Sequence, residues 1–456
     1  MKYILYIFLF IYFNGYSQFG PQQLISTEAH LPVCVFVADI DGDGKLDVLS
    51  ASRSSNNIAW YRNMDGYGTF SSLNLIGLLS EAKSEYAEDL DNDGDIDVLA
   101  TASFLDKVVW FENMDGLGNF SALKQIAGNA DGAFSAIAAD IDGDGDNDVI
   151  SASDVSGLAW YENIDGQGNF SATKIIDNNV PNSRSVVAAD LDGDGDLDLV
   201  GNGNAPDVAK IFWYENLDGF GNFGPRRVIR DVDSYSNGIF VIDADGDGDM
   251  DVFSASPGDN EIAWYKNIDG FGNFGPKIVI TSSMDSAWTV YGADLDNDGD
   301  TDIISTLVET FGGEVVWFEN VDGLGSFWEK QTITTEVQFP RSVIAADIDN
   351  DGDMDVIGSS QNDDKITWYE NYTILEIGEY QPNNLNIYPN PTKGLVFINS
   401  KNETIISIRL FDILGKEVLQ VDGNIQQLDI SNLQSGMYFL QITANDRNFV
   451  EKIIKE

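Results

Sequence analysis

The chain is poor in the residues on which most disulfides, catalytic triads and transition-metal sites depend. Its 456 residues include one cysteine, Cys34, and one histidine, His30. A single cysteine excludes an intrachain disulfide framework, and a single histidine excludes a multi-histidine metal site. Any Ser-His-Asp or Cys-His catalytic group would have to use His30, which precedes the first repeat and is interpreted as a loop residue. Cys34, in "VCVFVAD", is expected to be a buried strand residue.

Basic residues are also scarce. The chain has 25 Lys and Arg against 75 Asp and Glu, which gives a formal net charge of −50. Nucleic-acid binding needs a basic face, so this composition argues against it. Disorder is excluded because 43% of the residues are hydrophobic and 11% are aromatic. We therefore expect bound cations to balance part of the acidic charge.

No hydrophobic run is long enough to span a bilayer. The eleven apolar residues from Tyr3 to Phe13 are too few, but they follow Met1-Lys2 and precede the small residues Gly15 and Ser17. This pattern predicts a secretory signal peptide over residues 1–17. No cysteine for a lipoprotein anchor lies near the expected cleavage point. The mature protein is expected to be exported and to have no membrane span.

One unit is repeated seven times. Acidic runs begin every 50 to 53 residues, and each is followed by a Trp-containing signature such as "IAWYRNMDGYGTF". Each unit contains four short apolar runs separated by turn residues and no helical pattern. Four strands in each of seven units are typical of a β-propeller. We predict an all-β, seven-bladed propeller over residues 18–371.

The two ends of the repeat region predict how the ring closes. The first apolar run, "FGPQQLIS", resembles the "FGPKIVIT" that follows an earlier Trp signature, whereas the last signature, residues 368–371, has no such successor. Residues 19–26 are therefore expected to complete the seventh blade as its outer strand. This arrangement would fasten the ring non-covalently and remove an exposed edge.

The acidic runs predict calcium loops. They read D-x-D-[GN]-D-G-x-x-D. This pattern places oxygen ligands at motif positions 1, 3 and 5, a main-chain carbonyl ligand at position 7 and a turn at the glycine of position 6. Position 9 would supply a closing carboxylate. An EF-hand is excluded, because position 12 is Ser50 or Gly201 in two copies. We expect up to seven Ca²⁺ ions, since a purely structural acidic turn would leave the carboxylates without counter-ions.

The candidate metal residues occupy the odd positions of the seven runs, and only position 7 of the first copy is not aspartate. They are Asp39, Asp89, Asp140, Asp190, Asp243, Asp294 and Asp347 at position 1; Asp41, Asp91, Asp142, Asp192, Asp245, Asp296 and Asp349 at position 3; Asp43, Asp93, Asp144, Asp194, Asp247, Asp298 and Asp351 at position 5; Lys45, Asp95, Asp146, Asp196, Asp249, Asp300 and Asp353 at position 7; and Asp47, Asp97, Asp148, Asp198, Asp251, Asp302 and Asp355 at position 9. The lysine at position 7 indicates that only the carbonyl of that position binds metal.

The second signature has two interpretations. The stretch "NIDGQGNF", from Asn163 to Phe170, is either half of a second metal site or a hairpin turn, and Asp-Gly and Gly-Asn favour the turn. Trp160 and Tyr161 must point to opposite sheet faces, and both faces of a blade are covered by neighbours. Core packing is therefore expected for these aromatic residues, with sugar stacking as the alternative.

Strand parity separates two faces of the ring. In an antiparallel blade the first loop, which is acidic, and the third, regular loop lie on one side. The second loops ("SRSSNN", "GNAPDVAK", "LVETFGG") and the connections between blades ("EAHLP", "DNNVPNS", "DVDSYSN") lie on the other. The second set is variable, and binding residues are commonly located in variable loops on a rigid scaffold. We place the ligand surface opposite the acidic loops.

The repeat units resemble the FG-GAP/VCBS repeats of integrin-α-type seven-bladed propellers over residues 19–371. Such repeats have D-x-D-x-D-G-x-x-D calcium loops between neighbouring strands of a blade, so the resemblance implies the same fold and calcium binding by the aspartates named above. The chain departs from the integrin pattern in two respects: all seven units have the loop, and "FGP" replaces "GAP".

The repeat stops at Tyr372. Residues 372–384 are interpreted as a linker, and alternating apolar positions over residues 385–456 predict a small β-sandwich. This region resembles the C-terminal sorting domain of the type IX secretion system. The resemblance implies that the secretion machinery is a partner and that the product is secreted or attached to the outer-membrane surface. The matching residues are Tyr388-Pro389-Asn390-Pro391, Gly394, Gly415-Lys416, Gly436-Met437-Tyr438, Lys452 and Lys455.

Three functions are open at this point. The first is an extracellular calcium-stabilised binding or adhesion module for a glycan, matrix or protein ligand. The second is a lectin with sugar sites between blades. The third is a carbohydrate-active enzyme, but no catalytic constellation is recognisable beyond a pairing of Glu309 with another acid in the variable loops. We expect a binding protein rather than an enzyme.

Overall fold

The structure is a computed structural model that describes residues 18–203, 210–231, 235–282, 286–309, 312–373, 385–400, 405–412, 416–423, 426–434, 436–444 and 447–455. The expected signal peptide and most of the expected linker lie outside these residues, as do parts of the variable loops at 204–209, 232–234 and 310–311. The chain forms two compact units, Met1–Ile374 and Leu375–Glu456, which are described separately.

The first unit consists of four-stranded antiparallel sheets. Blade 1 contains β2 (Pro32–Ala38), β3 (Asp47–Ser52), β4 (Asn57–Tyr61) and β5 (Asn74–Leu78); blade 2 contains β6 (Ala82–Glu88), β7 (Asp97–Ala102), β8 (Lys107–Phe111) and β9 (Lys124–Ala127); blade 3 contains β10 (Ala133–Ala139), β11 (Asp148–Ser153), β12 (Gly157–Tyr161) and β13 (Lys174–Asp177); blade 4 contains β14 (Val186–Ala189), β15 (Asp198–Gly203), β16 (Lys210–Tyr214) and β17 (Arg227–Asp231). Blade 5 contains β18 (Gly238–Ile242), β19 (Asp251–Ser256), β20 (Glu261–Tyr265) and β21 (Ile278–Thr281); blade 6 contains β22 (Ala287–Ala293), β23 (Asp302–Glu309), β24 (Gly312–Phe318) and β25 (Gln331–Thr334); blade 7 contains β26 (Pro340–Ala346), β27 (Asp355–Ser360), β28 (Lys365–Tyr369) and β1 (Gln23–Ser26).

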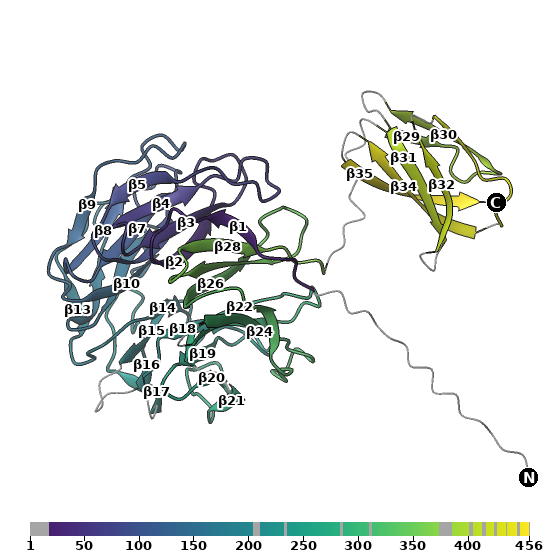
Figure 1. The fold of residues 1–456 in the computed structure, drawn as a ribbon. Coiled ribbons are helices and arrows are strands. Elements are labelled where there is room, and N and C mark those ends of the chain that lie inside the picture. The colour runs from purple at the N-terminus through teal and green to yellow at the C-terminus, as the bar shows by residue number, and fades with distance from the viewer. Residues whose placement is uncertain are drawn as a thin grey trace, which may run out of the picture. The chain divides into compact units, whose positions relative to one another are not determined.

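The sheets form a closed ring. The first strands of successive blades contact one another from β2 through β6, β10, β14, β18 and β22 to β26, and β26 in turn contacts β2. These first strands therefore surround the axis of the ring, as Figure 1 shows for the larger unit. The predicted seven-bladed propeller is confirmed.

The ring is closed by the N-terminal strand. β1 pairs antiparallel with β28, and Gln23 lies opposite Trp368. The pairing continues toward the N-terminus. Phe19 forms a bridge with Asn371, and the Gly20 amide donates to the Glu370 carbonyl at 2.7 Å. The expected completion of the seventh blade by residues 19–26 is confirmed, and the last blade has a full complement of strands.

The hydrophobic core lies between blades rather than within them. One cluster, for example, joins Ile40 and Leu49 of blade 1 to Val98 and Phe111 of blade 2. The second and third strands of the blades are buried on both faces, which explains their nearly continuous apolar sequences. This repeated interface provides the main stabilisation of the ring, because apolar burial contributes about 25 cal/mol per Å².

The Trp signature seals each interface between blades. Trp60 is 5% exposed and lies against Gly118 in the third loop of the next blade. A Cβ on Gly118 would be 2.3 Å from Trp60 Cζ2, and the φ of +80° at this position also favours glycine. Trp160 and Tyr161 are likewise buried, at 4% and 1% exposure. Core packing, which was expected for the signature aromatic residues, is confirmed.

The second unit is a β-sandwich, as predicted. One sheet has the order β29 (Leu385–Tyr388), β30 (Leu395–Ser400) and β33 (Gln427–Asp429), and the other has the order β32 (Glu417–Asp422), β31 (Ile405–Asp412), β34 (Gly436–Ala444) and β35 (Arg447–Lys455). A compact apolar cluster contains Val396, Leu410 and Leu440. Asn390 of the "YPNP" stretch binds β35 at both ends of its amide: Nδ2 donates to the Lys452 carbonyl at 2.6 Å, and Oδ1 accepts from the Ile454 amide at 2.9 Å.

The described residues include no helix with the length and hydropathy needed to cross a membrane.

Candidate functional site

Each acidic loop joins the first strand of a blade to the second. In blade 1 it links β2 to β3. Glycine at position 6 has a φ between +83° and +97° in every copy, from Gly44 to Gly352, so the sharp turn expected there is confirmed. Position 4, which is Gly or Asn, also has a positive φ in all copies, as at Gly42 and Asn92. The left-handed conformation therefore explains both the invariant glycine and the restriction to Gly or Asn.

The loop is held by hydrogen bonds from its own backbone. In blade 1, Asp39 Oδ2 accepts from the Gly44 amide at 2.8 Å, and Asp43 Oδ1 accepts from the Lys45 amide at 3.1 Å. The bond from the position-6 amide to the position-1 carboxylate recurs in all seven copies at 2.8 to 3.2 Å. The first and fifth positions therefore shape the loop as well as contributing oxygen atoms to it.

The aspartate at position 9 fastens the loop to the rest of its blade. Asp47 is fully buried; its Oδ2 accepts from the Ile40 amide at 3.2 Å and its Oδ1 from the Asn63 amide at 2.7 Å. Burial raises the pKa of Asp47 to about 7, and the equivalent aspartates behave in the same way. The predicted closing carboxylate therefore has a structural role that its position in the motif did not indicate.

An asparagine connects each acidic loop to the adjacent blade. Asn113, which is fully buried, donates from Nδ2 to the carbonyl of Ile40 in the loop of blade 1 at 2.8 Å. The same bond, at 2.7 to 2.9 Å, is formed in the other blades by Asn63, Asn163, Asn216, Asn267, Asn320 and Asn371. Sequence reasoning missed this role, although an asparagine follows the Trp signature in every unit.

The third loop is a hairpin turn, as favoured from sequence. Asn63 and Phe70 form a bridge, and the Met64 amide donates to the Thr69 carbonyl at 2.8 Å. Asp65 Oδ1 accepts from the Tyr67 amide within the turn at 3.0 Å. These bonds account for the recurring sequence of this loop as that of a turn.

The carboxylates of the loops converge in a manner that fits a cation. In Asp39, Asp41 and Asp43 one oxygen of each side chain lies within 4.8 Å of the others, and comparable groups occur in the other blades, such as Asp89 with Asp91 and Asp97. A ligand set made only of oxygens suits a hard cation such as Ca²⁺. The groups combine positions 1, 3 and 5 in blades 1, 3 and 4 and positions 1, 3 and 9 in blades 2 and 5, and metal binding by these carboxylates stays a prediction.

Several of these oxygens are buried without a hydrogen-bond donor among the described residues. They belong to six loops: Asp41 Oδ1, Asp89 Oδ1, Asp91 Oδ1, Asp142 Oδ1, Asp192 Oδ1, Asp245 Oδ1 and Asp294 Oδ1. A buried charged oxygen without a partner is costly. Burial, followed by the neighbouring Asp93, accordingly raises the pKa of Asp91 to about 6. A bound cation would remove this cost.

The side chains at position 7 lie against the third loop. Asp95 Oδ1 is 2.2 Å from the point where a Cβ on Gly116 would be, and Asp146 has the same relation to Gly166. In the first copy the Lys45 ammonium instead pairs with Asp43 Oδ2 at 2.7 Å. Metal binding through the position-7 carbonyl alone stays a prediction, and these side-chain positions agree with it.

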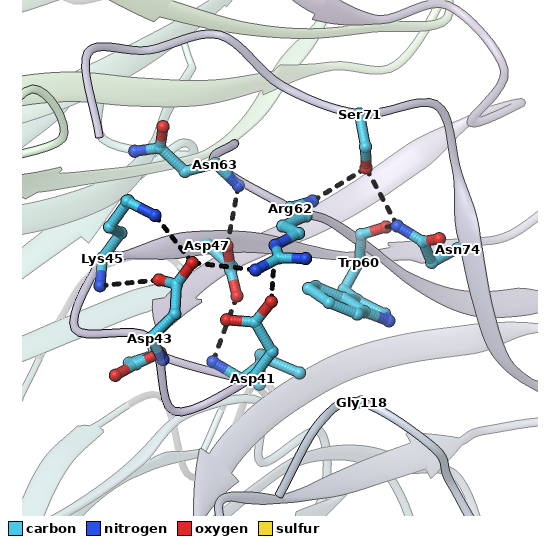
Figure 2. Close-up of polar contacts among 12 residues, drawn as sticks. Asp41, Asp43, Lys45, Asp47, Trp60, Arg62, Asn63, Ser71, Asn74 and Gly118 are labelled. Atoms are coloured by element: carbon cyan, nitrogen blue, oxygen red, sulfur yellow. Dashed lines mark hydrogen bonds and ion pairs between the residues drawn. The ribbon is translucent and has the colours of Figure 1, made fainter. Parts of the chain in front are cut away.

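Two of the seven loops contain a cation supplied by the protein. Arg62 Nε lies 2.5 Å from Asp41 Oδ2 and Arg62 Nη2 lies 2.9 Å from Asp43 Oδ2, as Figure 2 shows. In blade 5, Lys266 pairs with Asp245 and, at 3.0 Å, with Asp247. The other five blades have glutamate at this position of the signature: Glu112, Glu162, Glu215, Glu319 and Glu370. This difference between loops was not recognised in the sequence.

His30 and Cys34 are not part of the acidic loops. His30 is exposed in a loop, and its Nδ1 lies 3.0 Å from Asp364 Oδ2, which confirms the interpretation as a loop residue. Cys34 lies in β2 as expected, although the residue as a whole is only half-buried. Burial raises the pKa of its thiol, and the adjacent carboxyl of Glu85 is fully enclosed, so that burial raises its pKa to about 8.

Comparison with known proteins adds the family. A model described as an FG-GAP-like repeat matches residues 39–100, 89–151, 140–201, 243–305 and 306–358. A model described as a secretion system C-terminal sorting domain matches residues 386–456. Ulvan lyase NLR42 from Nonlabens ulvanivorans is 32% identical over 91 residues, which are 19% of this chain and 17% of that protein. The chain therefore matches less than a fifth of the length of this curated relative.

Solved structures support the fold alone, because their sequence identities are low. BBS1N, crystallised in complex with ARL6DN, has a TM-score of 0.55 at 8% identity and covers 78% of this chain and 97% of its own. The extracellular domain of the putative hybrid two-component system BT4673 from B. thetaiotaomicron has a TM-score of 0.50 at 10% identity, covering 96% and 59%. The sorting domain indicates a product that is secreted or attached to the outer-membrane surface. With repeat matches over more than half of its length, the chain belongs to the FG-GAP-like repeat family and ends in a type IX secretion sorting domain.

Proposed function

We propose that the first unit is a calcium-binding propeller that acts outside the cell as a binding or adhesion module for glycan, matrix or protein ligands. The observation that supports calcium most directly is the set of buried loop oxygens without donors in six of the blades. Carboxylates at positions 1, 3, 5 and 9 and the carbonyl at position 7 would hold the ion. When bound, calcium supplies positive charge to these loops and so fixes the turn between the first two strands of a blade.

The ligand surface is proposed to lie on the face opposite the acidic loops. All pairings within the blades are antiparallel, so the second loops and the connections between blades lie together at the other ends of the first strands. Phe104 and Leu105 in one second loop, and Val155 in another, are exposed apolar side chains on this face. The ring and its asparagine ties provide a rigid support for these variable loops.

A lectin is the second candidate. A hollow of about 380 Å³ between blades 3 and 4 is lined by Trp160, Lys174 and Phe220, among others, and this hollow favours a sugar site between blades. The Lys174 ammonium, however, lies 3.6 Å from the centre of the Trp160 ring and occupies one approach to it. A carbohydrate-active enzyme is the weakest candidate, because the single histidine is exposed and its Nδ1 lies 3.0 Å from Asp364 Oδ2.

Ligand-array screening of the full chain, with calcium present, tests the binding role. Serine replacements of Phe104, Leu105 and Val155 should abolish binding without lowering the melting temperature. Matched replacements of the exposed Leu117 and Phe271 in third loops, on the acidic side, should leave binding intact. The reverse pattern would overturn the placement of the ligand surface.

The same screen separates the alternatives. Binding that is lost on Phe220→Ala would favour the inter-blade lectin, and turnover of any member of a polysaccharide panel would favour the enzyme. Binding of a neutral sugar that chelation abolishes, while circular dichroism reports an intact fold, would place calcium in direct contact with the ligand.

A further inference from the structure

The axis of the ring opens into a basic pocket on the variable face. The pocket has a volume of about 200 Å³ and is lined by Val33, Arg53, Lys83, Phe134, Arg184, Trp288, Arg341 and Gln361. Five of these residues are each the second residue of the first strand of a blade, at the end remote from the acidic loop: Val33, Lys83, Phe134, Trp288 and Arg341. An adjoining hollow of about 260 Å³ shares Arg184 and Trp288 and adds Tyr235. Every blade thus contributes to this region.

The charge of the pocket is opposite to that of the chain. Four cationic side chains converge in a protein with only 25 Lys and Arg, and none of the described residues that line the pocket is acidic. Arg53 pairs with Glu81 at the rim, and Arg184 Nε lies 3.5 Å from Asp154 Oδ1. Within the described part of the chain, Lys83 and Arg341 have no carboxylate within ion-pair distance.

Aromatic rings hold these cations in place. The Arg341 guanidinium lies 3.8 Å from the centre of the Trp288 ring and 4.3 Å from that of Phe339, and its Nε donates to Gln361 Oε1. Arg184 lies 5.2 Å from the centre of the Phe134 ring. Of the five N–H donors of Arg341, this contact with Gln361 uses one, so a planar set of donors is available to a ligand.

The positive charges of the cluster act on one another. Burial, together with the charges of Arg53 and Arg184, lowers the pKa of Arg341 to about 10. Burial and then the charge of Arg53 also lower the pKa of Lys83. The cationic side chains repel one another, which costs free energy. An anion in the pocket would relieve this repulsion and would be attracted by several cations at once.

We propose that this axial pocket binds the carboxylate or sulfate group of an acidic saccharide. The inference rests on the proposed function, in which the variable face binds the ligand, and it specifies the chemistry of that ligand. Arginine forms paired hydrogen bonds to planar and tetrahedral oxyanions, and the position of Arg341 over Trp288 sets the plane of that fork in advance.

A saccharide fits the site better than an acidic peptide. Aromatic rings line both hollows. Arg184 lies over Phe134 and Arg341 over Trp288, whereas Tyr235 is exposed and offers a flat apolar surface that suits the C–H face of a pyranose next to its charged group. Concave, aromatic-lined sites with a few fixed polar groups are typical of small-ligand recognition. A peptide would use the cations without needing these rings, so an acidic peptide serves as a comparison ligand.

The test is calorimetric titration of the calcium-loaded full chain with oligogalacturonate, with its methyl ester, with a sulfated oligosaccharide and with polyglutamate. The acidic saccharides should bind and the ester should not, and affinity should fall as salt is raised. Arg341→Gln and Lys83→Gln should each weaken binding about tenfold or more. Neither should lower the melting temperature much, because the repulsion that each variant relieves offsets the ring and hydrogen-bond contacts that it removes. Lys330→Gln, which removes one positive charge from an ion pair with Glu314, is the control and should bind normally.

Several outcomes overturn the proposal. Equal binding of the methyl ester would show that the charge is not recognised, and tighter binding of polyglutamate would assign the pocket to a peptide. Unchanged affinity in Arg341→Gln and Lys83→Gln would place the acidic saccharide elsewhere. If the array detects a neutral ligand that depends on Phe104, Leu105 and Val155 while no acidic saccharide binds, the pocket inference fails and the proposed function stands. If no ligand binds on any array, the proposed function itself fails.

Discussion

Arg62 and Lys266 should make the acidic loops of blades 1 and 5 weaker calcium sites than the other five. Arg62 contacts Asp41 at 2.5 Å and Asp43 at 2.9 Å, and Lys266 contacts the equivalent pair in blade 5. These are position-3 and position-5 carboxylates, the ones that a calcium ion would use. A metal ion must therefore displace the basic side chain or share the carboxylates with another positive charge.

The size of the effect follows from the contacts that calcium replaces. A hydrogen bond to a charged group contributes about 1.5–3 kcal/mol. The Arg62 side chain is 46% exposed, so solvent screening reduces the net loss to about 1–2 kcal/mol for the whole side chain. A difference of that size corresponds to roughly a five- to thirtyfold weaker affinity.

Calorimetric titration of chelator-treated full chain with calcium measures this difference. The wild-type protein should show two classes of site, with the weaker class formed by blades 1 and 5. The double variant Arg62→Glu, Lys266→Glu gives both blades the residue found in the other five, and its sites should merge into one class. Lys330→Glu reverses the charge in the same way at one position away from the loops and should leave two classes. A single class in the wild-type protein, or equal effects of the double variant and the control, would refute the reasoning.

Four further predictions concern stability. Chelation should lower the melting temperature measured by calorimetry, because a ligand at about 100 times its Kd stabilises the folded state by roughly 2.7 kcal/mol per site; an unchanged value would argue against metal. Gly118→Ala should destabilise the ring by roughly 2 kcal/mol or more, through its positive φ and its contact with the signature tryptophan of the preceding blade, whereas Gly224→Ala, with no positive φ and its nearest atom at 3.4 Å, should cost little in urea unfolding. Asn113→Ala should cost about 1–3 kcal/mol in the same assay, because it leaves a buried carbonyl of the neighbouring loop without that donor. Burial raises the pKa of Glu85 to about 8, well above its unfolded value near 4.5. This carboxyl therefore does not destabilise the folded state below about pH 4.5, but it does so increasingly as the pH rises toward 8, by on the order of 3 kcal/mol at pH 7. Glu85→Gln should remove that part of the pH dependence of unfolding, and an unaltered profile would contradict the prediction.

The propeller was predictable because its information is repeated. Seven units of four apolar runs give the strand count of each blade and the number of blades, and no single unit needs to be interpreted alone. The closure by β1 followed from a missing element, since the last Trp signature lacks an outer strand and the N-terminus has one to spare. The acidic motif likewise indicated its own turn at Gly44 and its equivalents.

What the sequence left out depends on contacts between distant residues. The bond from Asn113 to the Ile40 carbonyl joins residues 73 positions apart in different blades, and no local sequence pattern indicates which carbonyl accepts it. Arg62 and Lys266 replace the glutamate that the other blades have at one position of a repeated signature. From the sequence this is ordinary surface variation, and only the structure shows that the two side chains lie beside the aspartates. No spacing in the sequence indicates the axial pocket, because residues that line it, such as Arg53 and Arg341, belong to different blades.

The separation of charge along the first strands bears on how calcium and ligand are related. β26 has Arg341 of the basic pocket as its second residue and ends beside Asp347 of an acidic loop. Seven residues at about 3.3 Å each place these ends roughly 20 Å apart, more than two Debye lengths at physiological ionic strength. Calcium in the loops can therefore change the field at the pocket only slightly. Its effect on an anionic ligand must act through the rigidity of the ring, so saccharide affinity should be nearly independent of calcium as long as the propeller stays folded.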